Sequence, residues 1–263
     1  NILGKLTQNY FLTLNKSVQC DDLSTFKAIL KRYHMPFNTH ISIKNPVMKK
    51  TLERAQKQEI KFLHRAVRKL DEKKVTLLLK QGTPCYLENE KNCPMAITFS
   101  QRSYSRSNFE QRHATVLSAL LKQFLSLETN TSTGIEKTLS RVEQIIESYS
   151  SRHYNLESYC NQLRWLHQEV IPYLREKLDD LDIISLESYE DLINNNVRLS
   201  CLFKDNTRRP FRFDDLTKGS KHPISRQRYS QEDIITLPKA VLLQSLAPST
   251  DFKRTSKSQA PTC

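Results

Sequence analysis

Apolar residues recur three and four positions apart along most of this chain, which is the spacing of amphipathic helices. The pattern is clearest between residues 61 and 82. Leu63, Ala66 and Val67 line one face of a first short helix, and an apolar set at 75–79 lines a second. Gly82 follows, where a helix commonly ends in a left-handed residue. The sequence therefore predicts a helical hairpin here.

Weaker copies of this hairpin flank it on both sides. Upstream, apolar residues between 17 and 31 repeat the pattern 49 positions earlier, which predicts an insertion or an extra helix within 45–60. Downstream, a helix is expected to start at Ala96, and the stretch 114–124 supplies its partner. One hairpin cannot bury its apolar face alone, so the three are expected to stack.

The remaining sequence is expected to form two further regions. A polar, turn-forming stretch at 126–134 marks a boundary, so we divide the chain into 1–127, 128–203 and 204–263. The second region predicts a helical bundle, with a long helix kinked at Pro172 and a last helix over 185–200. The third is rich in charge and proline, and it predicts a flexible linker, a short helix and a disordered tail. The expected fold class is all-α.

The hairpin at 61–82 resembles an ankyrin repeat. The letters K-F-L-H-R-A at 61–66 match the T-P-L-H-x-A opening of that family, whose period is 33 residues. Leu78-Leu79 and Gly82 match the end of its second helix, and Cys93-Pro94 opens the next unit 32 residues after Lys61. The resemblance covers about residues 8–127, as three degenerate repeats, and it implies an array of stacked helix pairs.

Such an array implies protein–protein recognition rather than catalysis. By position in the repeat, the resemblance assigns partner contacts to one first-helix set and one hairpin tip. These are Arg65, Arg68 and Lys69 on the helix, and Glu88, Asn89, Glu90 and Lys91 at the tip. The expected partner is an acidic protein.

Charge adds to this expectation because it is unevenly distributed. Residues 1–127 hold 22 lysines and arginines against 9 acidic residues, which equals the net charge of +13 for the whole chain. The densest part also contains a basic patch: Lys49, Lys50, Arg54, Lys57, Lys61, Lys73 and Lys74. A positive field of this kind speeds encounter with acidic proteins, nucleic acid or anionic lipid. The simpler alternative is a solvated face that keeps the protein soluble.

Nucleic acid is the less favoured of these partners, because such sites usually place aromatic residues among the basic ones. Phe62 is the lone aromatic residue in the run, at a position expected in the core. Contact with an anionic membrane surface stays open as an alternative. No window approaches 18 consecutive apolar residues, so no transmembrane segment is expected.

The sequence contains few signs of catalysis and predicts neither a cofactor nor a metal site. Six scattered cysteines indicate reduced thiols and a reducing compartment. The best nucleophile pair is Cys160 with His153 or His167, although a buried structural cysteine explains Cys160 more simply. The acidic set of Glu187, Glu190 and Asp191 is explained by charge at a helix start. A cysteine-dependent enzyme that uses the repeats as its substrate adaptor remains the alternative to a scaffold.

The small, polar C-terminal end resembles translocation signals of effectors that intracellular bacteria inject by type IV secretion. Ankyrin-like repeats joined to unfamiliar helical regions also resemble such effectors. The resemblance implies a bacterial protein that acts in the cytoplasm or nucleus of a host cell, on a host protein. The oligomeric state is not predicted.

Overall fold

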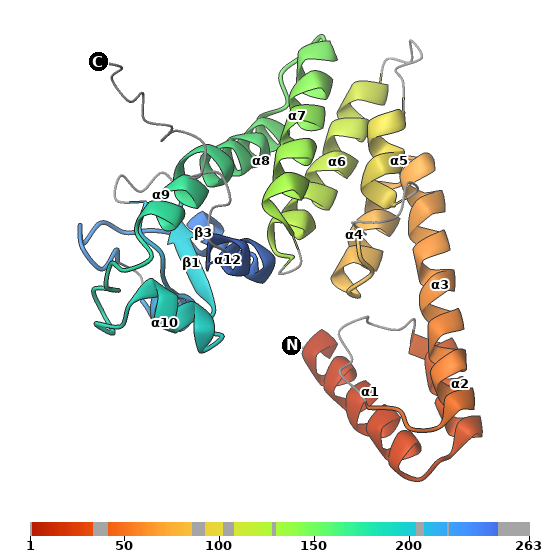
Figure 1. The fold of residues 1–263 in the computed structure, drawn as a ribbon. Coiled ribbons are helices and arrows are strands. Elements are labelled where there is room, and N and C mark those ends of the chain that lie inside the picture. The colour runs from red at the N-terminus through yellow and green to blue at the C-terminus, as the bar shows by residue number, and fades with distance from the viewer. Residues whose placement is uncertain are drawn as a thin grey trace, which may run out of the picture. The chain divides into compact units, whose positions relative to one another are not determined.

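The computed structural model describes residues 2–33, 42–85, 93–101, 108–127, 130–203, 208–219 and 221–246. These residues are mainly helical, as predicted, with one small sheet (Figure 1). They form two compact units. The first unit spans 1–124 and 141–159, and the second spans 125–140 and 160–263. No described helix is both long and apolar enough to cross a membrane.

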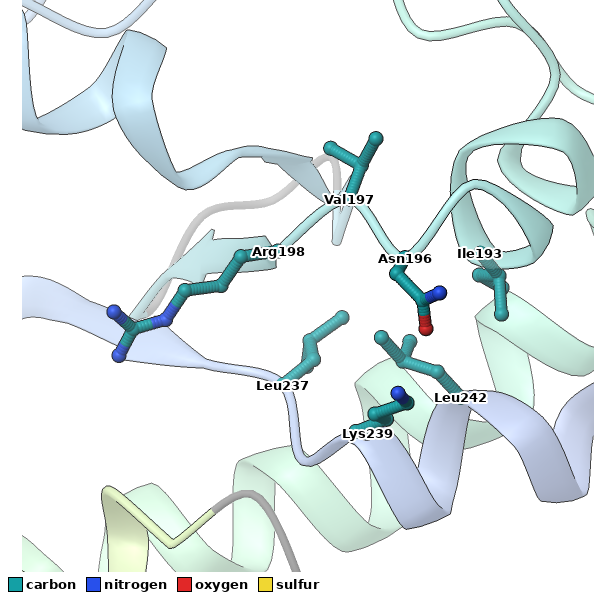
Figure 2. Close-up of a pocket in the computed structure, with 7 residues that line it drawn as sticks. All are labelled: Ile193, Asn196, Val197, Arg198, Leu237, Lys239 and Leu242. Atoms are coloured by element: carbon teal, nitrogen blue, oxygen red, sulfur yellow. The ribbon is translucent and has the colours of Figure 1, made fainter. Parts of the chain in front are cut away.

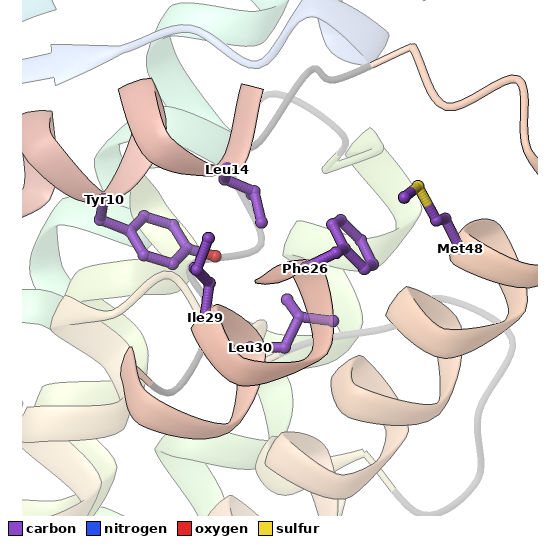
Figure 3. Close-up of a cluster of buried hydrophobic side chains, with 6 residues drawn as sticks. All are labelled: Tyr10, Leu14, Phe26, Ile29, Leu30 and Met48. Carbon is purple, nitrogen blue, oxygen red and sulfur yellow. The ribbon is translucent and has the colours of Figure 1, made fainter. Parts of the chain in front are cut away.

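The first unit begins with three helices packed around one apolar cluster. They are α1 (Ile2–Gln19), α2 (Leu23–Tyr33) and α3 (Pro46–Arg68). In Figure 3 the side chains of the cluster converge from all three helices. Its members are Tyr10, Leu14, Phe26, Ile29, Leu30 and Met48. The predicted upstream hairpin is therefore present, and the first turns of α3 close its core.

Helix α3 differs from the prediction in length. It begins at Pro46, behind an Asn45 N-cap that accepts hydrogen bonds from the Val47 and Met48 amides, and runs for 23 residues without a break. The separate extra helix expected within 45–60 is thus the first half of α3. The long helix buries Met48 in the N-terminal cluster and Leu63 in the next hairpin.

Helix α4 (Glu72–Lys80) pairs with α3 as the second predicted hairpin. Val75 and Leu78 are buried as expected, whereas Leu77 is 55% exposed. Gly82 has φ 87°, and Thr83 N–H donates to the Leu78 carbonyl, which together form the predicted left-handed helix end.

The third hairpin consists of α5 (Pro94–Ser100) and α6 (Phe109–Leu125). Side chains of this hairpin satisfy carbonyl groups left open at the ends of the preceding helices. Gln101 Nε2 donates to the Arg68 carbonyl at 3.2 Å, and Arg112 Nη2 donates to the Leu70 carbonyl at 3.0 Å. Gln123 Nε2 donates to the Thr83 carbonyl at 3.0 Å. Each hydrogen bond ties the third hairpin to the second.

Two helices, α7 (Ser132–Ser148) and α8 (Tyr154–Trp165), contribute residues to both units. A π-helical turn (Leu166–Val170) joins α8 to α9 (Ile171–Glu176). Pro172 lies at the start of α9, where its missing N–H is tolerated. The long helix predicted to kink at Pro172 thus changes there from a π-helical turn to α9.

The second unit contains strands that the all-α expectation did not include. Strand β1 (Leu199–Leu202) pairs antiparallel with β2 (Phe211–Arg212) on one side and β3 (Ile234–Thr236) on the other. In register, Ser200 lies opposite Phe211 in β2 and Thr236 in β3. All four β1 residues are buried, so this short apolar run pairs as a central strand.

Three further helices alternate with these strands along the sequence. They are α10 (Tyr189–Asn194) before β1, α11 (Phe213–Lys218) between β2 and β3, and α12 (Lys239–Leu246) after β3. The helix predicted over 185–200 is therefore limited to 189–194. It ends because Asn196 has φ 56° and β1 begins at Leu199. The described part of 204–263, expected to hold only a linker, a short helix and a tail, contributes two strands, two α-helices and a short 3₁₀-helix instead. Residues 247–263 lie outside the described residues.

Candidate functional site

The basic residues of α3 form one continuous row. They follow one another at intervals of three or four positions, which places them on a single helix face. We call this row the α3 basic stripe: Lys50, Arg54, Lys57, Lys61, Arg65 and Arg68. All six are exposed, whereas Met48, Leu63 and Ala66 of the same helix are buried. At 1.5 Å per residue, the stripe extends over about 27 Å.

The other residues predicted to bind a partner lie next to the stripe or outside the described residues. Lys69 is the C-cap of α3 and is exposed, next to the end of the stripe. Glu88, Asn89, Glu90 and Lys91 lie outside the described residues. Arg65 and Arg68 also occupy the last turn of α3, where a cation stabilises the negative end of the helix dipole.

The remaining members of the predicted basic patch lie beside the stripe. Lys49 is exposed on α3, and Lys73 and Lys74 are exposed on the first turn of α4. The Lys74 ammonium lies 5.9 Å from the centre of the Phe62 ring, within the range of a cation–π contact. Phe62 is only half-buried, so the core position predicted for it is wrong in degree. Its ring instead helps to hold a cation at the surface.

Two loops of the second unit have the same construction. Loop 1 (Leu181–Ser188) and loop 2 (Lys221–Arg228) are each closed by an antiparallel bridge between their first and last residues. In both loops the sixth residue, Leu186 or Arg226, has φ 59°. The amide of that residue donates to the carbonyl of the second, at 2.8 Å in loop 1 and 3.0 Å in loop 2.

A buried polar side chain braces each loop from inside. In loop 1, one carboxylate oxygen of Asp182 accepts from the backbone N–H of Ser185 at 2.9 Å and from its hydroxyl at 2.8 Å. In loop 2, Nδ1 of His222 accepts from the Ile224 and Ser225 amides at 3.1 and 3.0 Å. In small domains such as zinc fingers and RING domains, a bound metal ion stabilises the fold in place of such hydrogen bonds. Among the described residues, no cluster of His, Cys, Asp and Glu could hold one.

Loop 1 carries an exposed cluster of aliphatic side chains. Leu181 is 51% exposed and Leu186 is 71% exposed, and Ile183 and Ile184 are exposed between them. Ile224 of loop 2 occupies the same position in its loop as Ile184 and is also exposed. We call the four residues of loop 1 the loop lip. A patch of solvent-exposed aliphatic side chains on a rigid loop is typical of an interaction surface.

Both loops adjoin strand β2. Glu187 of loop 1 forms an ion pair with Arg212 at 3.8 Å, and the His222 ring of loop 2 lies edge-on against Phe211 with ring centres 5.5 Å apart. A sequence signal for this pair of loops exists, although helical periodicity does not reveal it. Ile-Ser, followed by Tyr four positions after the Ser, occurs at 184–189 and again, 40 positions later, at 224–229.

The first unit contains a buried histidine in a hydrogen-bonded network. His113 on α6 is 1% exposed, and its Nε2 lies 2.9 Å from the Thr98 carbonyl. Its Nδ1 meets the Tyr149 hydroxyl, so the neutral ring with a proton on Nε2 satisfies both partners. Nearby, the Glu110 carboxylate accepts from the Ser150 hydroxyl at 2.8 Å, which lowers the pKa of Glu110.

This network predicts a loss of stability in mild acid. Burial lowers the pKa of His113 below its usual 6.5, although the hydrogen bond to Thr98 opposes the shift. The contribution of His113 is therefore complete above about pH 6.5 and is lost as the pH falls toward the lowered pKa. We expect the Tm to fall between pH 7 and 5, and H113Q to flatten that decline. A Tm that declines equally in the wild type and H113Q would contradict this prediction.

Two of the residues considered for catalysis, Cys160 and His153, each contact another side chain. Cys160 is 2% exposed within α8, and the Arg164 guanidinium donates to its sulfur at 3.9 Å. His153 instead meets the Ser151 hydroxyl at 3.3 Å. Asp191 accepts from the Ser188 hydroxyl at the start of α10, as expected for a helix-start charge. Of the five described cysteines, none is in a disulfide and only Cys20 is exposed.

A small pocket lies between the end of α10, β1 and α12 (Figure 2). Its volume is about 60 Å³, well below the 300–1,000 Å³ of ordinary ligand sites. Ile193, Leu237 and Leu242 line it together with Asn196 and Lys239. The Arg198 side chain extends away from these residues in Figure 2. Its guanidinium carbon lies 4.0 Å from the centre of the Phe213 ring. The pocket has room for water rather than for a cofactor.

Comparison with known proteins adds no assignment to these surfaces. No family model, curated protein or solved structure matches this chain.

Proposed function

We propose that this protein is an interaction scaffold that binds an acidic partner protein through the first unit. The observation that supports the proposal is the α3 basic stripe, which places six exposed cations on the helix face opposite the buried one. Because none of these side chains is needed in the core, their alignment is available to a ligand. A row of like charges destabilises its own fold slightly, and a partner of opposite charge removes that cost.

The ankyrin-type stacking remains part of this proposal. Its support is that α3 packs on α2 and α5 packs on α3, and that side chains of the third hairpin satisfy open carbonyl groups at the ends of the second. The resemblance to injected effectors further suggests a host protein as the partner, reached in the host cytoplasm or nucleus after type IV secretion.

A second surface favours an adaptor that holds two proteins. The loop lip gathers exposed aliphatic groups in the second unit, and the Asp182 brace keeps loop 1 in one conformation. Preorganised apolar loops bind with little loss of conformational entropy. In such an adaptor the stripe recognises an acidic protein, and the lip contacts a second protein through an apolar surface.

Variants of the stripe and of the loop lip test the two surfaces independently. We expect R65E/R68E/K69E to reduce capture of acidic partners from a host-cell lysate at least tenfold, because both attraction and steering are lost. The matched control K44E/K80E/K122E makes the same change in net charge at exposed lysines elsewhere in the unit. I184S/L186S should instead remove a different set of proteins. Quantitative mass spectrometry of the captured proteins measures both, and partner lists unchanged in every variant would contradict the proposal.

A further inference from the structure

A groove runs between α2 and the middle of α3, apart from the residues assigned to partner binding by the repeat pattern. Its volume is about 330 Å³, within the range of ordinary binding pockets. Lys27, Leu30 and Lys31 line it from α2. Thr51, Arg54, Ala55, Gln58, Glu59 and Phe62 line it from α3.

The inner wall of the groove is apolar. Leu30 is 7% exposed because its other side packs in the N-terminal cluster, and Ala55 and Phe62 are half-buried beside it. Figure 3 shows Leu30 on α2 beside Phe26, within the same cluster. The N-terminal core therefore supports this wall, and a large apolar side chain entering the groove would gain buried contact with little rearrangement.

The rim of the groove is cationic. Lys27, Lys31 and Arg54 are all exposed at its edge, and Lys74 lies over the Phe62 ring from α4. Glu59, in contrast, is only 5% exposed and belongs to the lining. A phosphate or a bare polyanion that filled the groove would approach the Glu59 carboxylate. The geometry therefore favours a ligand with an apolar anchor inside and carboxylates at the rim.

The ligand should also be extended. Beyond Arg54 the basic stripe continues along α3 through Lys57 and Lys61 to Arg65 and Arg68, which lie past Phe62 at the end of the groove. A small molecule would contact only the cations at the rim. A peptide segment of several helical turns would contact the rim and also the cations of the stripe beyond the groove.

We propose that the α2–α3 groove binds an acidic amphipathic segment of a partner protein. One large apolar side chain of the segment fills the space between Leu30 and Phe62, and its carboxylates face Lys27, Lys31 and Arg54. This inference rests on the proposed function, since it names the class of segment that an acidic partner would present and where it would dock.

Selection from a displayed library of random twelve-residue peptides against the full chain tests the proposal. We expect enriched peptides to combine several acidic residues with one aromatic or leucine anchor. A fluorescein-labelled synthetic copy should bind at least tenfold more weakly to K27E/K31E, and equally weakly to Q58W, which plugs the groove without changing charge. The control K49E/K73E matches the charge change outside the groove and should alter Kd less than threefold.

Three results would overturn the inference. One is enrichment of peptides that lack acidic residues or an apolar anchor, and another is an affinity that Q58W leaves unchanged. The third is tighter binding to phosphatidylserine vesicles than to the peptide, lost in K27E/K31E, which would indicate a membrane surface instead. If R65E/R68E/K69E abolishes partner capture while Q58W does not, the scaffold function stands and the groove inference fails.

Discussion

Replacing Phe26 with alanine is expected to lower the free energy of unfolding of the first unit by about 3–5 kcal/mol. Phe26 is 0% exposed at the centre of the N-terminal cluster, between residues of α1 and α3. Its loss leaves a cavity at the point where these three helices pack together. Urea unfolding followed by helical circular dichroism, together with amide exchange in α1 and α2, measures the effect.

The control for this experiment lies on the same hairpin. Leu12 on α1 is 64% exposed, so L12A removes an apolar side chain without creating a cavity. Its expected effect is within about 0.5 kcal/mol of zero. Similar losses in F26A and L12A would show that the α1–α2 hairpin does not pack as described.

The second large effect is expected at the brace of loop 1. D182A should lower the free energy of unfolding of the second unit by about 2–3 kcal/mol, because the half-buried Ser185 amide and hydroxyl lose their acceptor. The amides of Ser185 and Leu186 should then exchange much faster with solvent. D182N keeps one acceptor oxygen and should fall between the wild type and D182A.

Asp179 provides the matched control for Asp182. It is an exposed aspartate three residues earlier, and D179A should leave both stability and loop exchange close to wild type. Equal exchange at Ser185 in D179A and D182A would mean that the carboxylate does not hold the loop. In that case the Asp182 carboxylate would not preorganise the loop lip for binding, while the proposal for the stripe on α3 would be unaffected.

The helical half of the fold could be predicted because its signals are local. Leu63, Val75 and Gly82 lie within one hairpin, and helical periodicity with a glycine stop is sufficient to place its two helices. The charge row on α3 follows from the same periodicity. Its full extent could not be predicted, because the repeat spacing indicated an insertion or an extra helix within 45–60 rather than one continuous helix.

The second unit was harder to predict because its order depends on distant partners. Leu199–Leu202 continues a helical apolar pattern in the sequence, and only pairing with Phe211 and Ile235 makes it a strand. Phe211, Leu216 and Ile234 lie in or beside a stretch that composition alone marks as a linker. Together with Leu202 they form a small apolar core. A short, charged segment folds here because its few apolar residues meet one another.

By itself, the sequence determined that this protein is mainly helical, that its positive charge is concentrated in the first half, and that one face of the helix through Lys61 is basic. Only the tertiary structure decided that Asp182 and His222 brace matching loops, that aliphatic groups cluster on loop 1, and that Leu30 and Phe62 form the wall of one groove. Helix periodicity repeats within four residues, so it can be followed along the chain. Braces, lips and grooves join residues tens of positions apart, and their geometry exists only once the chain has folded.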